Sequence, residues 1–365
     1  MPIVAGIDEA GYGPMLGPLV VASVSFRQEW DEGKTGRSWA SRDHATSGRG
    51  EAGRGIRVCD SKKLYSPRKG LAELEKSVLA FFSCLHPGAS FGAWEELLEE
   101  ISPGHCEKLR EIPWYRDARI RLPVEATRVV IGNGVEALGR SGEASALRGV
   151  RCEIVEPQEF NRLVDSGLNK ADLLFAVTSR LIGRLWEECR SSQTCGGSRS
   201  GARSRLGTQW FSGLCLFRTP DGGCGRLGSR DFLCHPRLVV HAGKHGGKTY
   251  YARNLQAVFP ESHIVPLKES PADSVYCVVS DSGDAMLVSF LRDGEDRNFG
   301  LALASLFAKY VRELHMLAFN EYWSKRLPNL ARTSGYHCDA RKFLARATPL
   351  LETLSIPPEM LVRAR

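Results

Sequence analysis

The chain lacks any hydrophobic run of about 18 residues, the length that a membrane-spanning helix requires. It also lacks a signal-peptide core, because Asp8 and Glu9 interrupt the first apolar segment. Its 11 cysteines are an odd number without a C-x-x-C pair or a zinc-ligand spacing, which predicts reduced thiols and excludes a regular disulfide framework. We therefore expect a cytoplasmic protein with no membrane partner.

Acidic residues are in deficit, since 49 Lys and Arg outnumber 42 Asp and Glu and give a net charge of +7. Such a charge permits an anionic partner such as nucleic acid. The 365 residues are 42% hydrophobic and 25% charged, which is ordinary for a globular protein and excludes a fully disordered or coiled-coil chain. We expect a monomer with one large domain over residues 1–345 and a C-terminal tail or short helix over 346–365.

Three segments are rich in Gly, Ser and charge and lack apolar periodicity. Residues 28–56 and 190–230 are predicted to be flexible insertions, either loose nucleic-acid contacts or solvated linkers, and residues 132–149 are predicted to be a loop. The remaining chain alternates strand and helix patterns, which predicts an α/β protein. Expected strands lie at 3–7, 18–26, 236–243 and 262–267, with a hairpin over 275–293 turning at 282–284. Expected helices lie at 71–85 and 299–323, and residues 157–189 are expected to form one or two helices.

The most informative segment is Gly6-Ile7-Asp8-Glu9-Ala10-Gly11-Tyr12-Gly13-Pro14. Two adjacent carboxylates at the end of an apolar strand need a site that stabilises charge, and oxygen ligands of this kind suit Mg²⁺. The alternative is that Asp8 only caps the following turn. The glycines allow backbone N–H groups to approach a sugar or phosphate, but their spacing and the prolines do not fit a dinucleotide-binding loop. Lys62 and Lys63, in Asp60-Ser61-Lys62-Lys63-Leu64, either meet phosphates or form a solvated surface.

Five segments, in order, resemble type 2 ribonucleases H (ribonuclease HII). GIDEAGYGPMLGPLVVA resembles that family's first strand and glycine loop, and DSKKL resembles its next signature. LNKADLLFAVTSRLI is similar to its Asn-containing helix start, ALASLFAKYVREL to its A-A-S-x-x-A-K helix, and SGYHCDARKF to its G-Y-G-T segment. The resemblance implies a ribonuclease H-like fold, with a mixed central sheet flanked by helices, and a metal-dependent endonuclease that hydrolyses the RNA strand of RNA–DNA hybrids.

The resemblance also implies four carboxylates around Mg²⁺ or Mn²⁺. Asp8 and Glu9 match the first two, and Asp273 is placed by its spacing to Tyr276, with Glu269 as a nearby alternative. Gly243 stands where the family has its remaining aspartate. His241, on the same strand face, is either a substitute ligand or a strand histidine satisfied by hydrogen bonds.

Substrate residues follow from the same resemblance. Gly11 and Gly13 would contact the 2′-hydroxyl, while Tyr12 replaces the family's arginine. Lys62, Lys63 and Asn169 would position an RNA–DNA hybrid or a ribonucleotide-containing duplex. Tyr336 matches the family's sugar-stacking tyrosine, the alternative being a core or capping aromatic.

Two other functions stay open. The loss of a carboxylate at Gly243 is typical of a nucleic-acid-binding protein that kept the fold and lost efficient hydrolysis. The change at Tyr12 leaves room for another nuclease substrate, such as branched DNA.

Overall fold

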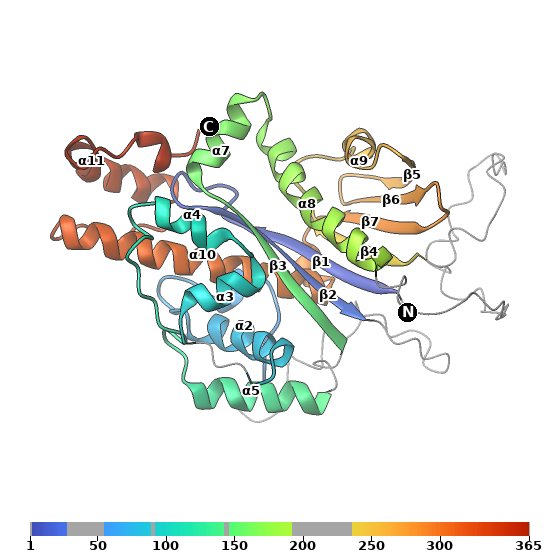
Figure 1. Cartoon of the computed structure of the whole chain (residues 1–365), viewed down its shortest axis with the longest axis horizontal. Coiled ribbons are helices and arrows are strands. Elements are labelled where there is room, and N and C mark those ends of the chain that lie inside the picture. The colour runs from blue at the N-terminus through green and yellow to red at the C-terminus, as the bar shows by residue number, and fades with distance from the viewer. Residues whose placement is uncertain (1, 28–54, 89–91, 142–145, 192–235, 365) are drawn as a thin grey trace.

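A computed structural model describes residues 2–27, 55–88, 92–141, 146–191 and 236–364. Most of the two expected insertions therefore lies outside the described residues. Seven strands form one mixed sheet in the order β3-β2-β1-β4-β7-β6-β5 (Figure 1). The strands are β1 (Ile3–Ala10), β2 (Leu19–Arg27), β3 (Leu147–Val155), β4 (Leu238–Gly243), β5 (Ser262–Glu269), β6 (Asp273–Ser280) and β7 (Ala285–Leu291).

Helices cover both faces of this sheet (Figure 1). The α-helices are α1 (Ser61–Leu64), α2 (Ala72–Leu85), α3 (Trp94–Ile101), α4 (His105–Glu111), α5 (Arg128–Ser141), α7 (Pro157–Asp165), α8 (Lys170–Ser191), α9 (Ala252–Val258), α10 (Phe299–Arg326) and α11 (His337–Thr353), with 3-10 turns η3 (Gly294–Asp296) and η4 (Pro358–Met360). The expected fold class, an α/β arrangement with a mixed central sheet between helices, is confirmed.

Strand direction brings the carboxyl ends of three strands together at one end of the sheet. β1 runs antiparallel to β2 and parallel to β4, and β4 runs parallel to β7. The carboxyl ends of β1, β4 and β7 therefore meet at one edge. The segments that follow these strands, the glycine loop after β1 and the η3 turn after β7, begin at this edge.

Alternation along β1 divides the core into two layers. Ile3, Ala5 and Ile7 face the layer that holds α8 and α9, whereas Gly6 and Asp8 face α10. A Cβ atom on Gly6 would lie 2.0 Å from the carbonyl carbon of Gly300, so glycine is required for β1 to lie directly against the start of α10. This close approach brings Asp8 to the first turns of that helix.

The sequence-based elements are mostly confirmed. The one or two helices expected over 157–189 are two, α7 and α8, and the expected hairpin is β6 and β7, whose turn holds Gly283 at a φ of 81°.

The loop predicted for 132–149 is wrong, because α5 and the start of β3 occupy most of it. Gly134 lies where a Cβ would be 2.5 Å from Ile56, so this glycine is a close helix contact and not a break in the helix.

The domain boundary expected at residue 345 falls inside α11, and the segment after that helix is not a free tail. Leu361 is fully buried, and the backbone of Arg363 donates a hydrogen bond to the carbonyl of Met15. The end of the described chain is thus part of the same core as the glycine loop.

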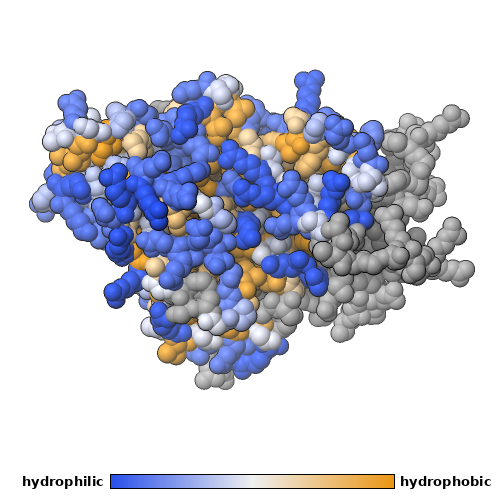
Figure 2. All heavy atoms as spheres, viewed as in Figure 1, coloured by the Kyte–Doolittle hydropathy of each residue, from blue (hydrophilic) through white to orange (hydrophobic). Residues whose placement is uncertain are grey.

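Surface and cysteine properties agree with the sequence. The face seen in Figure 2 is mostly hydrophilic, with apolar residues in scattered groups. No helix in the described part of the chain is long and apolar enough to cross a membrane. The cysteines that the structure describes are free.

Candidate active site

Two acidic side chains lie together at the carboxyl end of β1. Asp8 is only 6% exposed and Glu9 is partly exposed. Oδ1 of Asp8 and Oε2 of Glu9 both lie within 4 Å of the position that a Cβ atom on Gly243 would take, so the two carboxyl groups are adjacent. Among the residues that the structure describes, no ion pair neutralises either group. Two adjacent carboxyl groups without a cation are a costly arrangement that points to a function.

A third carboxylate, Glu295 of η3, acts on the same pair. Burial raises the pKa of Asp8 well above its usual value, and the negative charges of Glu9 and Glu295 raise it further. Burial also raises the pKa of Glu9 to about 7, again with a contribution from Glu295. Sequence reasoning missed Glu295, although the acidic run Asp293, Glu295 and Asp296 directly before the longest helix was a usable signal.

Gly243 ends β4 beside this pair. A Cβ atom at Gly243 would lie 2.6 Å from Oδ1 of Asp8 and 3.6 Å from Oε2 of Glu9. The structure therefore brings together the two carboxylates and the glycine where sequence comparison expected an aspartate. Any side chain at this position would point at the carboxyl groups and force Asp8 to move.

The Asp60–Leu64 segment packs against the same corner of the fold. Asp60 caps α1, since its side chain accepts a hydrogen bond from the backbone N–H of Lys62. The hydroxyl of Ser305 on α10 donates a hydrogen bond to Ser61 at 3.3 Å, and Lys63 forms an ion pair with Asp296 of η3. Lys63 is thus engaged in holding η3, whereas Lys62 is exposed and its charge lowers the pKa of Glu9. The two lysines have different environments, and Lys62 is the one free to meet an anion.

The glycine loop lies next to an exposed aromatic ring. Gly11 has a φ of 87°, and a Cβ there would contact both Arg312 and the carbonyl of Pro18. A Cβ on Gly13 would lie 3.9 Å from the ring of Tyr336, which is 51% exposed. Tyr336 is therefore not a core aromatic. It stands over the loop, and the guanidinium of Arg312 lies 5.9 Å from its ring centre.

Two buried arginines hold this loop in place. Arg363 donates hydrogen bonds to the carbonyls of Gly11 and Gly17, and Arg312 donates to Leu16 and Ser334. Neither arginine touches the carboxylates, so their role is to position the loop. Sequence reasoning missed Arg363 because no local pattern marks an arginine near the end of a chain as buried.

Tyr12 and Asn169 lie on the α8 side of the site. Burial, followed by the charge of Glu9, raises the pKa of the Tyr12 hydroxyl. Asn169 precedes α8, where its side chain and that of Asp172 bond each other, and Asp172 forms an ion pair with Lys248 at 2.7 Å. Asn169 is therefore part of a polar cluster beside the loop that follows β4.

Asp273 is not brought to the pair. Gly243 of β4 pairs with Leu291 of β7, and Leu291 pairs in turn with Asp273 of β6. With strands about 4.8 Å apart, the backbone of Asp273 lies about 14 Å from β1. Its two oxygens accept from Lys268 and Arg297, each at 2.8 Å, and these cations hold its pKa below the usual value despite partial burial. Because Arg297 directly follows η3, Asp273 supports the turn that carries Glu295.

Of the remaining two candidates, Glu269 lies far from the carboxyl pair, and His241 lies on β4, two residues before Gly243. Glu269 is on the edge strand β5, one strand beyond Asp273, and accepts a hydrogen bond from Tyr276. His241 pairs with Gly6 in the sheet, and its buried Nδ1 has no hydrogen-bond partner. Burial lowers the pKa of His241 to about 4, so the ring is neutral. One ring nitrogen of His241 therefore lacks the hydrogen bond expected of a histidine that is satisfied within a strand.

No family model matches the chain, and no curated protein matches it. Among solved structures, the chain is similar to ribonuclease HII from Archaeoglobus fulgidus in its complex with PCNA, at 14% identity and a TM-score of 0.35 over 100% of this chain and 94% of the other. It is similar to ribonuclease H2 from Pyrococcus horikoshii OT3 at 12% identity and a TM-score of 0.32, covering 98% and 92%. Bst-RNase HIII in complex with Mn²⁺ is similar at 11% identity and a TM-score of 0.36, covering 99% of this chain and 66% of that one.

Proposed function

We propose that this protein is a metal-dependent nuclease of the ribonuclease H type that hydrolyses the RNA strand of an RNA–DNA hybrid. One observation carries the proposal: the carboxyl groups of Asp8 and Glu9 lie together beside Gly243, close enough to Glu295 for its charge to act on them, and without an ion pair in the described chain. Exposed Lys62, the glycine loop and Tyr336 surround the same point. The resemblance in the sequence motifs supports the choice of substrate.

The donor set fits Mg²⁺ or Mn²⁺. Asp8, Glu9 and Glu295 offer only carboxylate oxygens, which these hard cations prefer. The mutual repulsion that raises the pKa of Asp8 and Glu9 is what a bound cation would relieve. When bound, such ions supply charge stabilisation at the phosphate and activation of water.

The other residues would hold the duplex. Lys62 is exposed and can meet a backbone phosphate. Gly13 is exposed, so its backbone can approach a 2′-hydroxyl, the group that distinguishes RNA from DNA, whereas Gly11 is buried against Arg312 and shapes the loop. The exposed ring of Tyr336 can stack on the neighbouring sugar or base. Tyr12, beside Glu9, would occupy the place of the arginine in the resembling family.

The test is a cleavage assay on an RNA–DNA hybrid, a single-ribonucleotide duplex and a branched DNA, each with Mg²⁺ or Mn²⁺. Asp8→Asn and Glu295→Gln should each lower the cleavage rate by about 10²–10³-fold, since each removes charge from the proposed ion site. Asp273→Asn is the matched control and should keep most of the activity, because its oxygens are held by Lys268 and Arg297. Cleavage that does not depend on Asp8 would remove the proposal, and cleavage of branched DNA alone would change its substrate.

Gly243 favours a second candidate, a hybrid-binding protein with impaired hydrolysis. Two variants separate the candidates. Gly243→Ala adds only the Cβ that would press on Asp8, whereas Gly243→Asp adds the same Cβ and a carboxylate. In an active enzyme both variants should lower the rate. In an impaired one, the wild type should bind hybrid without turnover and Gly243→Asp should raise cleavage above Gly243→Ala.

A further inference from the structure

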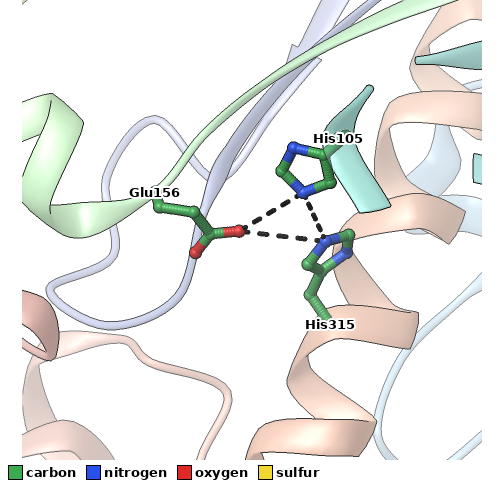
Figure 3. Close-up of side chains that lie close together, drawn as sticks. All are labelled: His105, Glu156 and His315. Carbon is green, nitrogen blue, oxygen red and sulfur yellow. Dashed lines mark hydrogen bonds and ion pairs between the residues drawn. The ribbon is translucent and has the colours of Figure 1, made fainter. Parts of the chain in front are cut away.

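A second polar cluster lies inside the protein, apart from the carboxylates of β1. His105 begins α4, Glu156 stands between β3 and α7, and His315 is in the middle of α10. Their exposed fractions are 4%, 7% and 0%. Figure 3 shows the carboxyl group of Glu156 pointing toward the two imidazole rings. Within the described chain this is the one group of three His, Cys, Asp or Glu side chains whose ligand atoms all lie within 4.8 Å of one another; the carboxyl oxygens of Asp8, Glu9 and Glu295 do not all lie within this distance.

The three ligand atoms have the spacing of a first coordination shell. Nε2 of His105 lies 3.3 Å from Nε2 of His315, and Oε1 of Glu156 lies 3.7 Å from the first nitrogen and 3.8 Å from the second. The point equidistant from the corners of a triangle with these sides is about 2.1 Å from each, which matches Zn–N and Zn–O bond lengths.

The two Nε2 atoms are within hydrogen-bond distance of each other, and His315 presents the acceptor. Nδ1 of His315 lies 2.8 Å from the carbonyl of Val311, and since a carbonyl only accepts, the ring proton is on Nδ1 and Nε2 carries a lone pair. A backbone carbonyl on the far nitrogen is the usual support of a metal-ligating histidine. Oε1 of Glu156 is buried without any hydrogen-bond partner, while its other oxygen accepts from Tyr115 at 3.4 Å. An unpartnered buried carboxylate oxygen aimed at two imidazoles is costly unless a cation joins them.

The donor set distinguishes this cluster from the carboxylate site. Two imidazole nitrogens and one carboxylate oxygen suit borderline ions such as Zn²⁺ and disfavour Mg²⁺, which prefers oxygen. We infer that His105, Glu156 and His315 bind one Zn²⁺-class ion that joins α4 and the β3–α7 junction to α10.

The position gives the ion a structural role. His315 lies one turn after Arg312 on α10, and Arg312 donates to the carbonyl of Leu16 in the glycine loop. Arg363, which donates to Gly11, lies close enough to Glu156 for the two charges to interact. The ion would therefore lie behind the loop and stabilise its supports without touching substrate.

The experiment is to unfold the full chain, refold it with one equivalent of Co²⁺ in excess Mg²⁺, and remove loosely held ions by dialysis. Mg²⁺ fills oxygen-only sites, so retained Co²⁺ reports nitrogen-containing ones. We expect one retained Co²⁺ per chain, visible absorption, X-ray absorption showing imidazole scattering, and a thermal midpoint about 4 °C higher at ion concentrations a few hundredfold above Kd. His105→Gln should weaken retention by more than about 100-fold.

Two controls make the result specific. His245→Gln removes another buried histidine, one that contacts Thr178 outside the cluster, and should retain the ion. Asp8→Asn should also retain it while losing cleavage, so failure of the proposed nuclease and failure of this site are separate results. No retained ion in the wild type, sulfur scattering in place of imidazole, or equal retention by His105→Gln would each overturn the site. The wild-type spectrum decides the question even if a histidine variant does not fold.

Discussion

Removing one charge from the β1 carboxylates should stabilise the metal-free protein. Burial and neighbouring charge raise the pKa of Glu9 from 4.5 to about 7. Between these values the folded chain keeps the proton of Glu9 and the unfolded chain has released it, so stability is highest below pH 4.5 and falls as the pH rises to about 7. At 1.36 kcal/mol per pKa unit, the shift corresponds to about 3 kcal/mol of lost stability at pH 8.

Glu9→Gln removes this ionisation and should be about 3 kcal/mol more stable than the wild type at pH 8 in EDTA, with a difference that vanishes near pH 4. Asp8 contributes in the same direction, because its own pKa falls when the charge of Glu9 is removed. Urea unfolding from pH 5 to 8 measures the effect, and Glu261→Gln, an exposed acid, is the control that should show no such trend. Mg²⁺ or Mn²⁺ should stabilise the wild type most at pH 8 and flatten its pH dependence.

The reasoning is refuted if the free energy of unfolding changes equally with pH in the wild type and in Glu9→Gln. That result would mean that Glu9 is solvated or paired in the folded chain. A wild type that gains stability from pH 5 to 8 relative to the variant would refute it more strongly, because the sign would be that of a carboxylate with a protein cation beside it.

Three further predictions concern the surroundings of the site. Tyr336→Ala should weaken hybrid binding by about 1–3 kcal/mol in a titration, while Tyr336→Phe keeps it, because stacking needs the ring and not the hydroxyl. Lys62→Gln should reduce the slope of log K against log salt by about 0.9, the contribution of one phosphate contact. Gly6→Ala should destabilise the fold by about 3 kcal/mol in urea unfolding, since its Cβ would overlap Gly300, whereas Gly139→Ala, in open space on α5, should not destabilise.

Much of the fold was predictable because its signals are local. Short apolar runs marked β1 and β2 as buried strands, and the apolar period of 3.6 marked α2 and α10. The same rule failed at 132–149, where glycines were taken as breaks. Position 134 needs a glycine because Ile56 and Ala80 lie within contact distance of it. The sequence alone does not show this contact, which depends on how α2 and α5 pack together.

The site was only partly predictable, since spacing along a chain does not measure distance across a sheet. Asp8 and Glu9 are neighbours in sequence, and Gly243 was identified through the family resemblance; the structure has it beside Asp8 because β4 is parallel to β1. Asp273 also begins a strand at this edge, but two strands, β4 and β7, separate it from β1. Glu295 could not be found by counting strand positions, because it lies in the 3-10 turn η3 after β7. The packing of α10 on β1 brings this turn close to Asp8.

The acids around the site differ in whether a lysine or an arginine neutralises them. Glu295 and Lys63-bound Asp296 are neighbours on one turn, yet Asp296 is neutralised by its lysine and Glu295 faces the carboxyl pair. Asp273 contributes from a distance by fixing Arg297 after the turn. Under the proposed function, Glu295 would supply the third acid that position 243 lacks, provided that η3 is held near Asp8 and Glu9. Breaking the Asp273–Arg297 pair should then weaken cation binding only modestly, whereas Glu295→Gln should weaken it strongly, and calorimetric titration with Mn²⁺ compares the two variants directly.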